Sequence, residues 1–141
     1  RTLGVTGMLI GVGVILSTFY VFVAVYKGWG AMAFFVKANR FFTTSFAMLV
    51  LLAYLNRKHG VKHKRYIFVG TFYVLGPVLD RVAGKLMIDT LAGIVIFEVI
   101  IWNALFLSLF VYDWRTLKKI HPISWVGFIW FYVVWVLSLV L

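Results

Sequence analysis

The apolar residues of this chain are gathered in long blocks, and short polar segments separate the blocks. The blocks cover residues 5–26, 31–55, 66–85, 91–112 and 122–141. A helix needs about 20 apolar residues to cross the hydrocarbon core of a bilayer, and each block has roughly that length. The pattern therefore predicts an all-α polytopic bundle of about five transmembrane helices, in a single transmembrane domain that covers residues 1–141.

The second block is polar near its beginning, where Lys37, Asn39 and Arg40 stand among apolar residues. A span that began only after Arg40 would be short for a bilayer. We therefore expect a helix whose first turns lie in the headgroup region.

The amino-acid composition supports a membrane protein rather than a soluble domain. Hydrophobic residues make up 64% of the chain and charged residues 13%, whereas soluble domains have about 45–50% and about 25%. Cysteine is absent, which excludes disulfides, thiolate metal sites and cysteine nucleophiles. The sequence has no Ser–His–Asp set, phosphate-binding glycine loop or zinc-protease signature, so it gives little support to catalysis.

The basic residues lie mostly on one side of the predicted bundle. By the positive-inside rule this side is cytoplasmic, so we expect the visible N-terminus in the cytoplasm and the C-terminus outside. Anchoring to anionic headgroups explains the net charge of +10, and we expect the lipid bilayer, not nucleic acid, as the partner. The more basic side carries Arg1, Arg57, Lys58, Lys62, Lys64, Arg65, Arg115, Lys118 and Lys119, and the other side carries Lys27, Lys37, Arg40, Arg81 and Lys85.

Gly7 and Gly11 form a GxxxG pair in the first predicted helix. This spacing lets a neighbouring helix approach closely inside a membrane. We expect a helix-packing contact within the bundle, and dimerisation through the same face is the alternative.

Pro77 interrupts the third block. Proline lacks the N–H that would bond the carbonyl of Tyr73, so we expect a kink near Gly76.

Four charged residues follow Pro77 in the third and fourth blocks: Asp80, Arg81, Lys85 and Glu98. An unpaired charge costs about 2.5–3.5 kcal/mol at the centre of a membrane helix, and these four charges sum to zero. We therefore predict a buried charge cluster that locks the third and fourth helices together, with Arg81 and Glu98 as the direct pair. The alternative is the polar floor of a ligand pocket or of an ion path that the kink opens.

His63 and His121 each open a predicted helix on the cytoplasmic side, and Pro122 follows His121. Helix capping or headgroup contact is the favoured role for these histidines, since proline fits the first turn of a helix. The alternative is a cofactor site, because two histidines can ligate b-type haem. We expect no metal site, because cysteine is absent and few carboxylates lie nearby. Just before His121, Tyr112 and Trp114 predict an aromatic belt at the membrane surface.

Four short polar motifs follow one another along the chain: His63-Lys64-Arg65, then Pro77 and Arg81, then Tyr112-Asp113-Trp114, and finally His121-Pro122 with Gly127. In this order they resemble those of a family of small bacterial multi-pass membrane proteins with no assigned activity. The likeness spans nearly the whole chain, although Tyr66, Ile67 and Val126 stand where that family has Leu, Met and Trp. The resemblance implies the bacterial inner membrane, a histidine just before Arg1 and at least one earlier helix, so that this chain is truncated at its N-terminus.

Aromatic residues make up 19% of the chain, which suits a protein whose partners lie in the membrane plane. We expect a non-catalytic protein: an accessory or scaffold subunit of a larger membrane complex, or a bundle that binds a lipid or a small ligand. One alternative is a redox subunit that binds b-type haem or quinone through His63, His121 and the upstream histidine. Another is a proton or ion carrier that uses Asp80 and Glu98.

Overall fold

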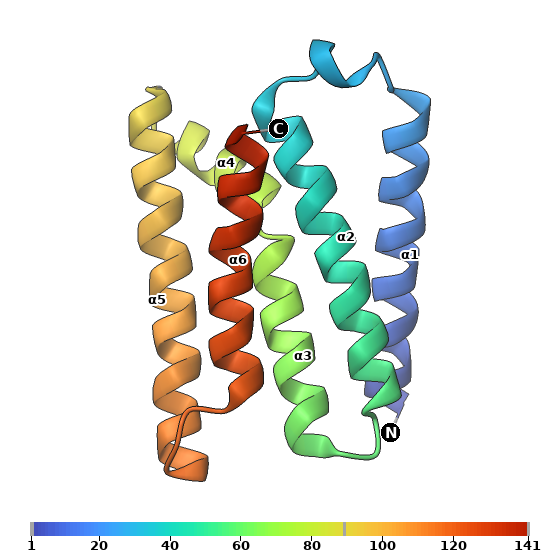
Figure 1. The fold of residues 1–141 in the computed structure, drawn as a ribbon, viewed down its shortest axis with the longest axis vertical. Helices are drawn as coiled ribbons and strands as arrows, with labels where there is room; N and C mark the ends of the chain where they lie inside the picture. Colours follow the sequence, from blue (N-terminus) through green and yellow to red (C-terminus); the bar gives the residue numbers. More distant parts are fainter. Residues whose placement is uncertain (1, 89, 141) are drawn as a thin grey trace.

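The computed structural model describes residues 2–88 and 90–140, and the regular elements of these residues are helices (Figure 1). The predicted all-α fold is therefore confirmed. In chain order the elements are α1 (Thr2–Ala24), the 3-10 turn η1 (Trp29–Ala31), α2 (Phe34–Leu55), α3 (Gly60–Tyr73), α4 (Gly76–Lys85), α5 (Leu91–Leu117) and α6 (Pro122–Val140).

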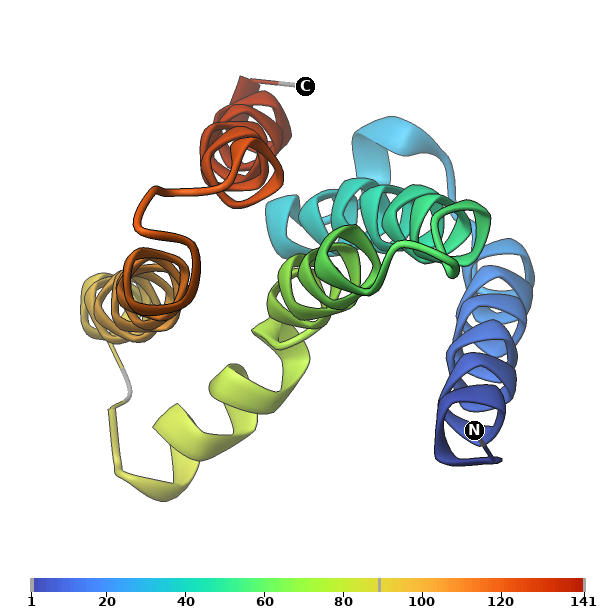
Figure 2. The same ribbon diagram turned by 90° about the horizontal axis from the view of Figure 1, so that it is seen from below.

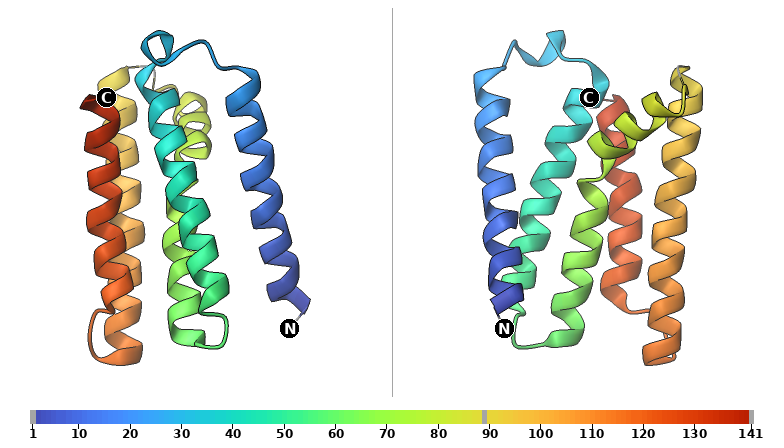
Figure 3. Two further views of the ribbon diagram at one scale, coloured as in Figure 1. Left: turned by 45° about the vertical axis from the view of Figure 1, so that its right-hand side comes forward. Right: turned by 180° about the vertical axis from the view of Figure 1, so that it is seen from behind.

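The helices form an up-and-down bundle. Helices α1, α3 and α6 run in one direction and α2 and α5 in the other, so α1 begins at the end of the bundle opposite to the one where α6 ends (Figure 1). Helix α2 packs on α1, α3 and α6, and α5 packs on α4 and α6. Figure 3 shows α1 at the margin of the bundle, beside α2.

Several helices have the length and composition of membrane spans. Helices α1, α2 and α5 are each apolar and long enough to cross a bilayer. The pair α3–α4, which is bent by 47°, makes a fourth span if the two helices count as one. These are the helices of an integral membrane protein. The apolar stretch of α6 is shorter, at Pro122–Ser138, so the fifth predicted span stays a prediction.

The break between α3 and α4 lies where Pro77 predicts a kink. Helix α3 ends at Tyr73 and α4 begins at Gly76, with the proline in its first turn. The indole N–H of Trp102 in α5 donates a hydrogen bond of 3.1 Å to the carbonyl of Phe72, in the last turn of α3. As Figure 2 shows, α4 then turns away from the axis of α3 toward the start of α5. The predicted kink is confirmed.

Two helices extend further than the apolar blocks predict. Helix α3 begins at Gly60 rather than at Tyr66, and α5 continues to Leu117 rather than ending at Tyr112. Hydropathy marks only the apolar part of a helix, whereas Lys and Arg are good helix formers that prolong it. Arg65 therefore lies inside a helix and not in a loop.

An aromatic core joins the helices at mid-height. The ring of Phe131 in α6, which is fully buried, lies 5.0 Å from Phe42, 5.2 Å from Tyr73, 4.9 Å from Trp102 and 5.6 Å from Phe106, measured between ring centroids. These partners come from α2, α3 and α5, so a single side chain contacts three helices. Most of the ring planes are steeply inclined to that of Phe131, and such edge-to-face pairs add about 0.5–1.5 kcal/mol each beyond their buried area.

Helices α3 and α6 approach most closely at Gly127. A Cβ atom at this position would lie 2.6 Å from Cγ1 of Val69, which is closer than side chains tolerate. The Gly127 carbonyl also accepts a hydrogen bond of 2.8 Å from the hydroxyl of Tyr73. Glycine is therefore favoured here because the branched side chain of Val69 packs directly on the Gly127 backbone.

The glycines of α1 do not make the intramolecular contact that their spacing predicts. A Cβ atom at Gly7 or at Gly11 would meet no other segment within 4 Å. Instead, the guanidinium of Arg40 in α2 donates a hydrogen bond of 2.6 Å to the carbonyl of Phe22 and lies 4.8 Å from the centroid of its ring. Gly11 lies on the same half-buried face of α1 as Met8 and Ile15, which pack against the core, and this face still leaves room for a Cβ atom. Dimerisation through Gly7 and Gly11 stays a hypothesis.

Candidate functional site

A buried ion pair joins Arg65 of α3 to Asp113 of α5, and it is the only ion pair within residues 2–88 and 90–140. The Nη2 and Nε atoms of Arg65 lie 2.6 Å and 2.8 Å from Oδ1 of Asp113, and the two side chains are 4% and 0% exposed. The other carboxylate oxygen accepts hydrogen bonds from the hydroxyl of Ser124 at 2.6 Å and from the backbone N–H of His121 at 2.9 Å. The remaining guanidinium nitrogen, Nη1, donates to the carbonyl of Val61 at 2.8 Å.

This network fastens the start of α6 to α3 and α5. Both oxygens of the Asp113 carboxylate accept hydrogen bonds, and Arg65 neutralises its charge. A buried ion pair is tolerated when its charges are paired and its polar atoms are hydrogen-bonded in this way. Sequence reasoning missed it, since Asp113 stands inside the predicted aromatic belt and Arg65 is one of several basic residues before the third block. One signal was present: Asp113 is the single acidic residue among the basic segments of that side.

His121 caps helix α6. Its Nδ1 atom accepts a hydrogen bond of 3.1 Å from the N–H of Ile123, and its carbonyl accepts from the N–H of Ser124 at 3.0 Å. Burial lowers the pKa of His121, and the guanidinium of Arg65 lowers that pKa further. The neutral imidazole is the form that can accept the capping bond, so the predicted capping role is confirmed for His121.

His63 also has a local backbone partner. Its Nδ1 atom lies 2.8 Å from the carbonyl oxygen of Ala53, at the end of α2. A carbonyl only accepts, so this nitrogen must carry the proton. Each of the two imidazoles therefore uses one ring nitrogen to hold a helix end. In the part of the chain that the structure describes, no three His, Asp or Glu side chains are placed to hold a metal ion.

Asp80 of α4 and Glu98 of α5 line the same cavity, and the charge of Asp80 lies near enough to act on Glu98. The predicted direct pair of Arg81 with Glu98 is wrong, because these two side chains form no ion pair, and Asp80 is the residue that lines the cavity together with Glu98. The reason is geometric: the break before α4 reorients this helix, and successive residues point about 100° apart around a helix. Arg81 and Lys85 are exposed, and neither is part of the one described ion pair.

A cavity of about 390 Å³ opens beside this carboxyl pair. Of the four predicted cluster residues, Asp80 and Glu98 line it, together with the amide of Asn39 and the backbone of Gly76 at the helix break. Its aromatic walls consist of Phe35, Phe42, Trp102 and Trp135. No Lys or Arg is among the described residues that line it. The cavity therefore combines negative polarity with π faces.

The carboxyl pair can hold a proton or another cation. Two carboxyl groups can hydrogen bond to each other only if they share a proton, because an ionised carboxylate has no donor. A bound cation can replace that proton, and the ring faces of Trp and Phe also attract cations, with Trp the strongest. The arrangement thus suits a positively charged ligand with an apolar body.

No protein-family model, curated protein or solved structure matches this chain. The two polar sites are therefore the features from which a function can be inferred.

Proposed function

We propose that this integral membrane protein is a small-ligand-binding bundle whose ligand is a small organic cation. The carboxyl groups of Asp80 and Glu98 would neutralise the charge, and the aromatic walls would contact the apolar part. The observation that carries the proposal is the presence of two carboxyl groups, and of no Lys or Arg among the described lining residues, on the wall of a cavity of about 390 Å³. Ligand pockets are of this size, and they are mostly apolar with a few placed polar groups.

The geometry of the cavity supports a ligand site over a purely structural role. A lock between α4 and α5 would pair opposite charges, whereas Asp80 and Glu98 are both acidic. Asp80 is exposed and Glu98 half-buried, and two acidic groups near each other repel unless a proton or another cation neutralises one of them. The Arg65–Asp113 pair shows how the same bundle builds a lock, with opposite charges and little exposure. Asp80 and Glu98 lack the opposite charges of such a lock.

A second candidate function is the transfer of a proton or metal cation across the membrane by the same pair. It is favoured by the two acidic side chains on one cavity wall, since acidic side chains inside membrane helices often belong to proton relays. Flux into proteoliposomes distinguishes the two functions. A carrier shows proton or cation flux that Asp80→Asn and Glu98→Gln abolish, whereas a binding protein retains the ligand and shows no such flux.

We also propose that the protein lies in the bacterial inner membrane, with the α2–α3 turn and the α5–α6 loop in the cytoplasm. The basic residues of these two segments support this orientation through the positive-inside rule. The likeness to small bacterial multi-pass membrane proteins, and a role beside other membrane subunits, belong to the same proposal. The open glycine face of α1 is the surface that such a subunit could cover.

Equilibrium binding of benzyltrimethylammonium to the purified protein tests the function. This probe carries a fixed positive charge beside one ring, and neopentylbenzene is its neutral isostere. We expect the wild-type protein to bind the cation at least about tenfold more tightly than the isostere, because two unit charges about 4 Å apart attract by about 4 kcal/mol at an effective dielectric constant of about 20. Asp80→Asn and Glu98→Gln should each remove most of this preference.

Arg81→Gln is the matched control, since Arg81 neighbours Asp80 on the same helix but does not line the cavity. This variant should keep the preference for the cation. If the wild-type protein binds the two probes equally well, or if Glu98→Gln binds the cation as tightly as the wild type, the proposed function is wrong.

A further inference from the structure

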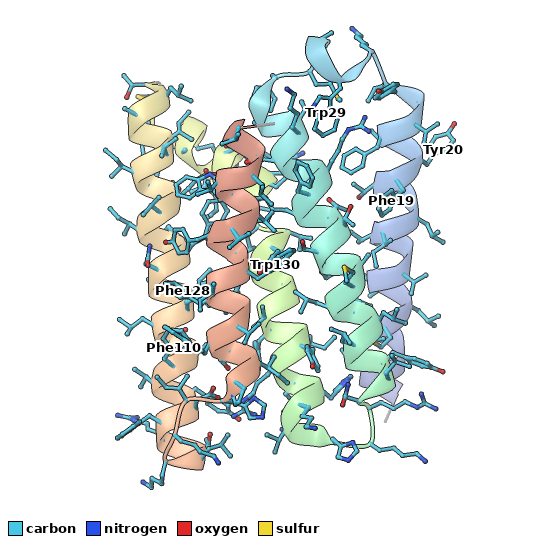
Figure 4. All side chains as sticks on the ribbon, viewed as in Figure 1. Phe19, Tyr20, Trp29, Phe110, Phe128 and Trp130 are labelled. Atoms are coloured by element: carbon cyan, nitrogen blue, oxygen red, sulfur yellow. The ribbon has the colours of Figure 1, made fainter. Side chains whose placement is uncertain are left out.

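A second cavity, an apolar groove, lies between α2, α3 and α6 and has a volume of about 330 Å³. Its lining runs from Leu52, Tyr66 and Pro122, close to the α2–α3 turn and the start of α6, to Ser45 and Trp130 at mid-height. Figure 4 shows Trp130 in this position, between α6 and α2. The groove is thus separate from the acidic cavity, which lies around α4 and the beginning of α5.

Two pairs of polar groups along the groove already bond to each other. The indole N–H of Trp130 donates to the hydroxyl of Ser45 at 3.2 Å, and the hydroxyl of Tyr73 donates to the carbonyl of Gly127 at 2.8 Å. What remains for an occupant is hydrocarbon and aromatic surface. Pro122 and Trp130 are eight residues apart, so the groove follows α6 for roughly 12 Å at 1.5 Å per residue. An extended hydrocarbon chain fits this shape.

Two lysines stand at the foot of the groove. Lys62 lies in the first turn of α3, and Lys119 of the α5–α6 loop lies three residues before Pro122, which lines the groove. Both lysines are exposed. Lys62 also precedes Tyr66 by one helical turn, which places the two on the same face of α3.

No described carboxylate neutralises these lysines. Asp113 is the acidic residue at this end, and its carboxylate is buried against Arg65. Asp80 and Glu98 line the acidic cavity at the other end of the bundle. The foot of the groove is therefore positively charged and open to an anion.

We propose that the groove binds one acyl chain of an anionic phospholipid whose headgroup lies against Lys62 and Lys119. Basic pockets between membrane helices on the cytoplasmic side are suited to anionic lipid headgroups. Apolar surface continues directly from this charge along the groove, so one molecule can satisfy both parts. The inference concerns a site other than that of the proposed function, and it stands whether or not the acidic cavity binds a cation.

Quenching of tryptophan fluorescence tests this site. The full chain is reconstituted in phosphatidylcholine vesicles that contain either phosphatidylglycerol or phosphatidylcholine with brominated acyl chains. Bromine quenches nearby tryptophans, and subtraction of the signal of Trp130→Phe isolates the contribution of Trp130. We expect brominated phosphatidylglycerol to half-quench this signal at a fraction at least about fivefold lower than brominated phosphatidylcholine, given the attraction of each lysine for anionic lipid.

The variants distinguish lipid binding at this groove from a general effect of surface charge. In the double variant Lys62→Gln with Lys119→Gln, the two brominated lipids should half-quench the Trp130 signal at nearly equal fractions. Lys58→Gln with Lys64→Gln is the matched control, because it removes the same charge while Lys64 points about 200° away from Lys62 around α3. This control should keep the preference. Val126→Phe, at an exposed position that lines the groove, should reduce the quenching of Trp130 although both lysines remain.

Three outcomes contradict the proposal. The first is equal quenching of the wild-type Trp130 signal by the two lipids. The second is an equal loss of preference in the two lysine double variants, which would show a surface-charge effect. The third is unchanged quenching in Val126→Phe, which would place the acyl chain outside the groove.

Discussion

Arg65 and Asp113 are 48 residues apart in the chain, and their charged atoms meet at 2.6 Å inside the bundle. The pair joins α3 to α5. The second oxygen of the Asp113 carboxylate accepts a hydrogen bond from the hydroxyl of Ser124, at the beginning of α6. One carboxylate therefore sets the relative positions of three helices at this end. Removal of either partner leaves a buried charge without compensation, and this has a measurable consequence.

We predict that Arg65→Met and Asp113→Leu each lower the free energy of unfolding by about 3–5 kcal/mol, because each leaves one buried charge alone. The double variant should recover a large part of this loss, since neither charge is then present. Denaturant titration of the protein in detergent micelles measures the four values of this cycle. Additive losses in the double variant would show that the two side chains do not interact.

Arg57→Met is the control for the loss of a positive charge at the same end. Arg57 is exposed and lies over the ring of Tyr54, at 4.4 Å from its centroid. Exposed charges contribute about 0–1 kcal/mol. If Arg57→Met lowered the free energy of unfolding as much as Arg65→Met does, burial of the ion pair would not be the cause of the loss.

Gly127→Ala should destabilise the bundle by about 1–3 kcal/mol, the usual cost of an overpacked contact. Its new Cβ atom would lie 2.6 Å from Cγ1 of Val69, and this branched side chain has little freedom to move. Val69→Ala in the same chain should restore part of the loss. Thermal unfolding followed by circular dichroism provides the comparison.

Gly13→Ala is the matched control for this prediction. A Cβ atom at Gly13 meets nothing within 4 Å, and alanine is the better helix former by about 1 kcal/mol. We expect unchanged or higher stability. If Gly13→Ala and Gly127→Ala behaved alike, the close approach of α3 and α6 would be in doubt.

The local features of this fold could be predicted from the sequence, and the contacts between distant helices could not. The kink follows from the missing N–H of Pro77, and the cap follows from His121 standing directly before Pro122. Both depend on neighbours in the chain. The partner of Glu98 instead depends on how far the break rotates α4. This angle cannot be predicted from hydropathy or from charge balance. The sequence therefore identifies Glu98 as a site residue while the choice between Asp80 and Arg81 as its neighbour needs the structure.

The same limit applies to Gly127, whose position inside an apolar block looks like that of the other glycines. Its contact with Val69 appears only when α3 and α6 are placed together. Conversely, Gly7 and Gly11 have the spacing of a packing motif, but no other segment comes within 4 Å of where their Cβ atoms would lie. A motif shows that a helix can be approached closely, and not which helix approaches it.

The stability of the protein should fall as the pH drops below about 6.5, the ordinary pKa of histidine. Burial and the nearby Arg65 lower the pKa of His121 in the fold, Lys62 and Lys119 act in the same direction, and Asp113 opposes them. Between the lowered and the ordinary pKa, the unfolded chain binds more protons than the folded one. Stability therefore rises with pH in this range and is lost as the pH falls.

His121→Asn isolates this effect, because asparagine also caps helices but does not titrate. The difference in unfolding free energy between the wild type and this variant should change with pH in that range. A difference that stays constant between pH values of about 5 and 8 would exclude His121 as the titrating group.

Reporter fusions test the proposed orientation. A cytoplasmic reporter fused after Lys62 should be active, and one fused after residue 141 should be inactive, because the basic segments keep the first site in the cytoplasm. A reporter that requires export should give the reverse pattern. Activity of the cytoplasmic reporter after residue 141 would overturn the orientation.

The central claim is that the helix break at Gly76 and Pro77 places Asp80, and not Arg81, against Glu98. The chain contains no cysteine, so cysteine pairs can be introduced without background. Membranes that contain Asp80→Cys with Glu98→Cys are treated with a short bismethanethiosulfonate, and the linked peptides are counted by mass spectrometry. We predict rapid linkage of this pair and little linkage of Arg81→Cys with Glu98→Cys. Faster linkage from position 81 than from position 80 would contradict the claim and, with it, the acidic cation site.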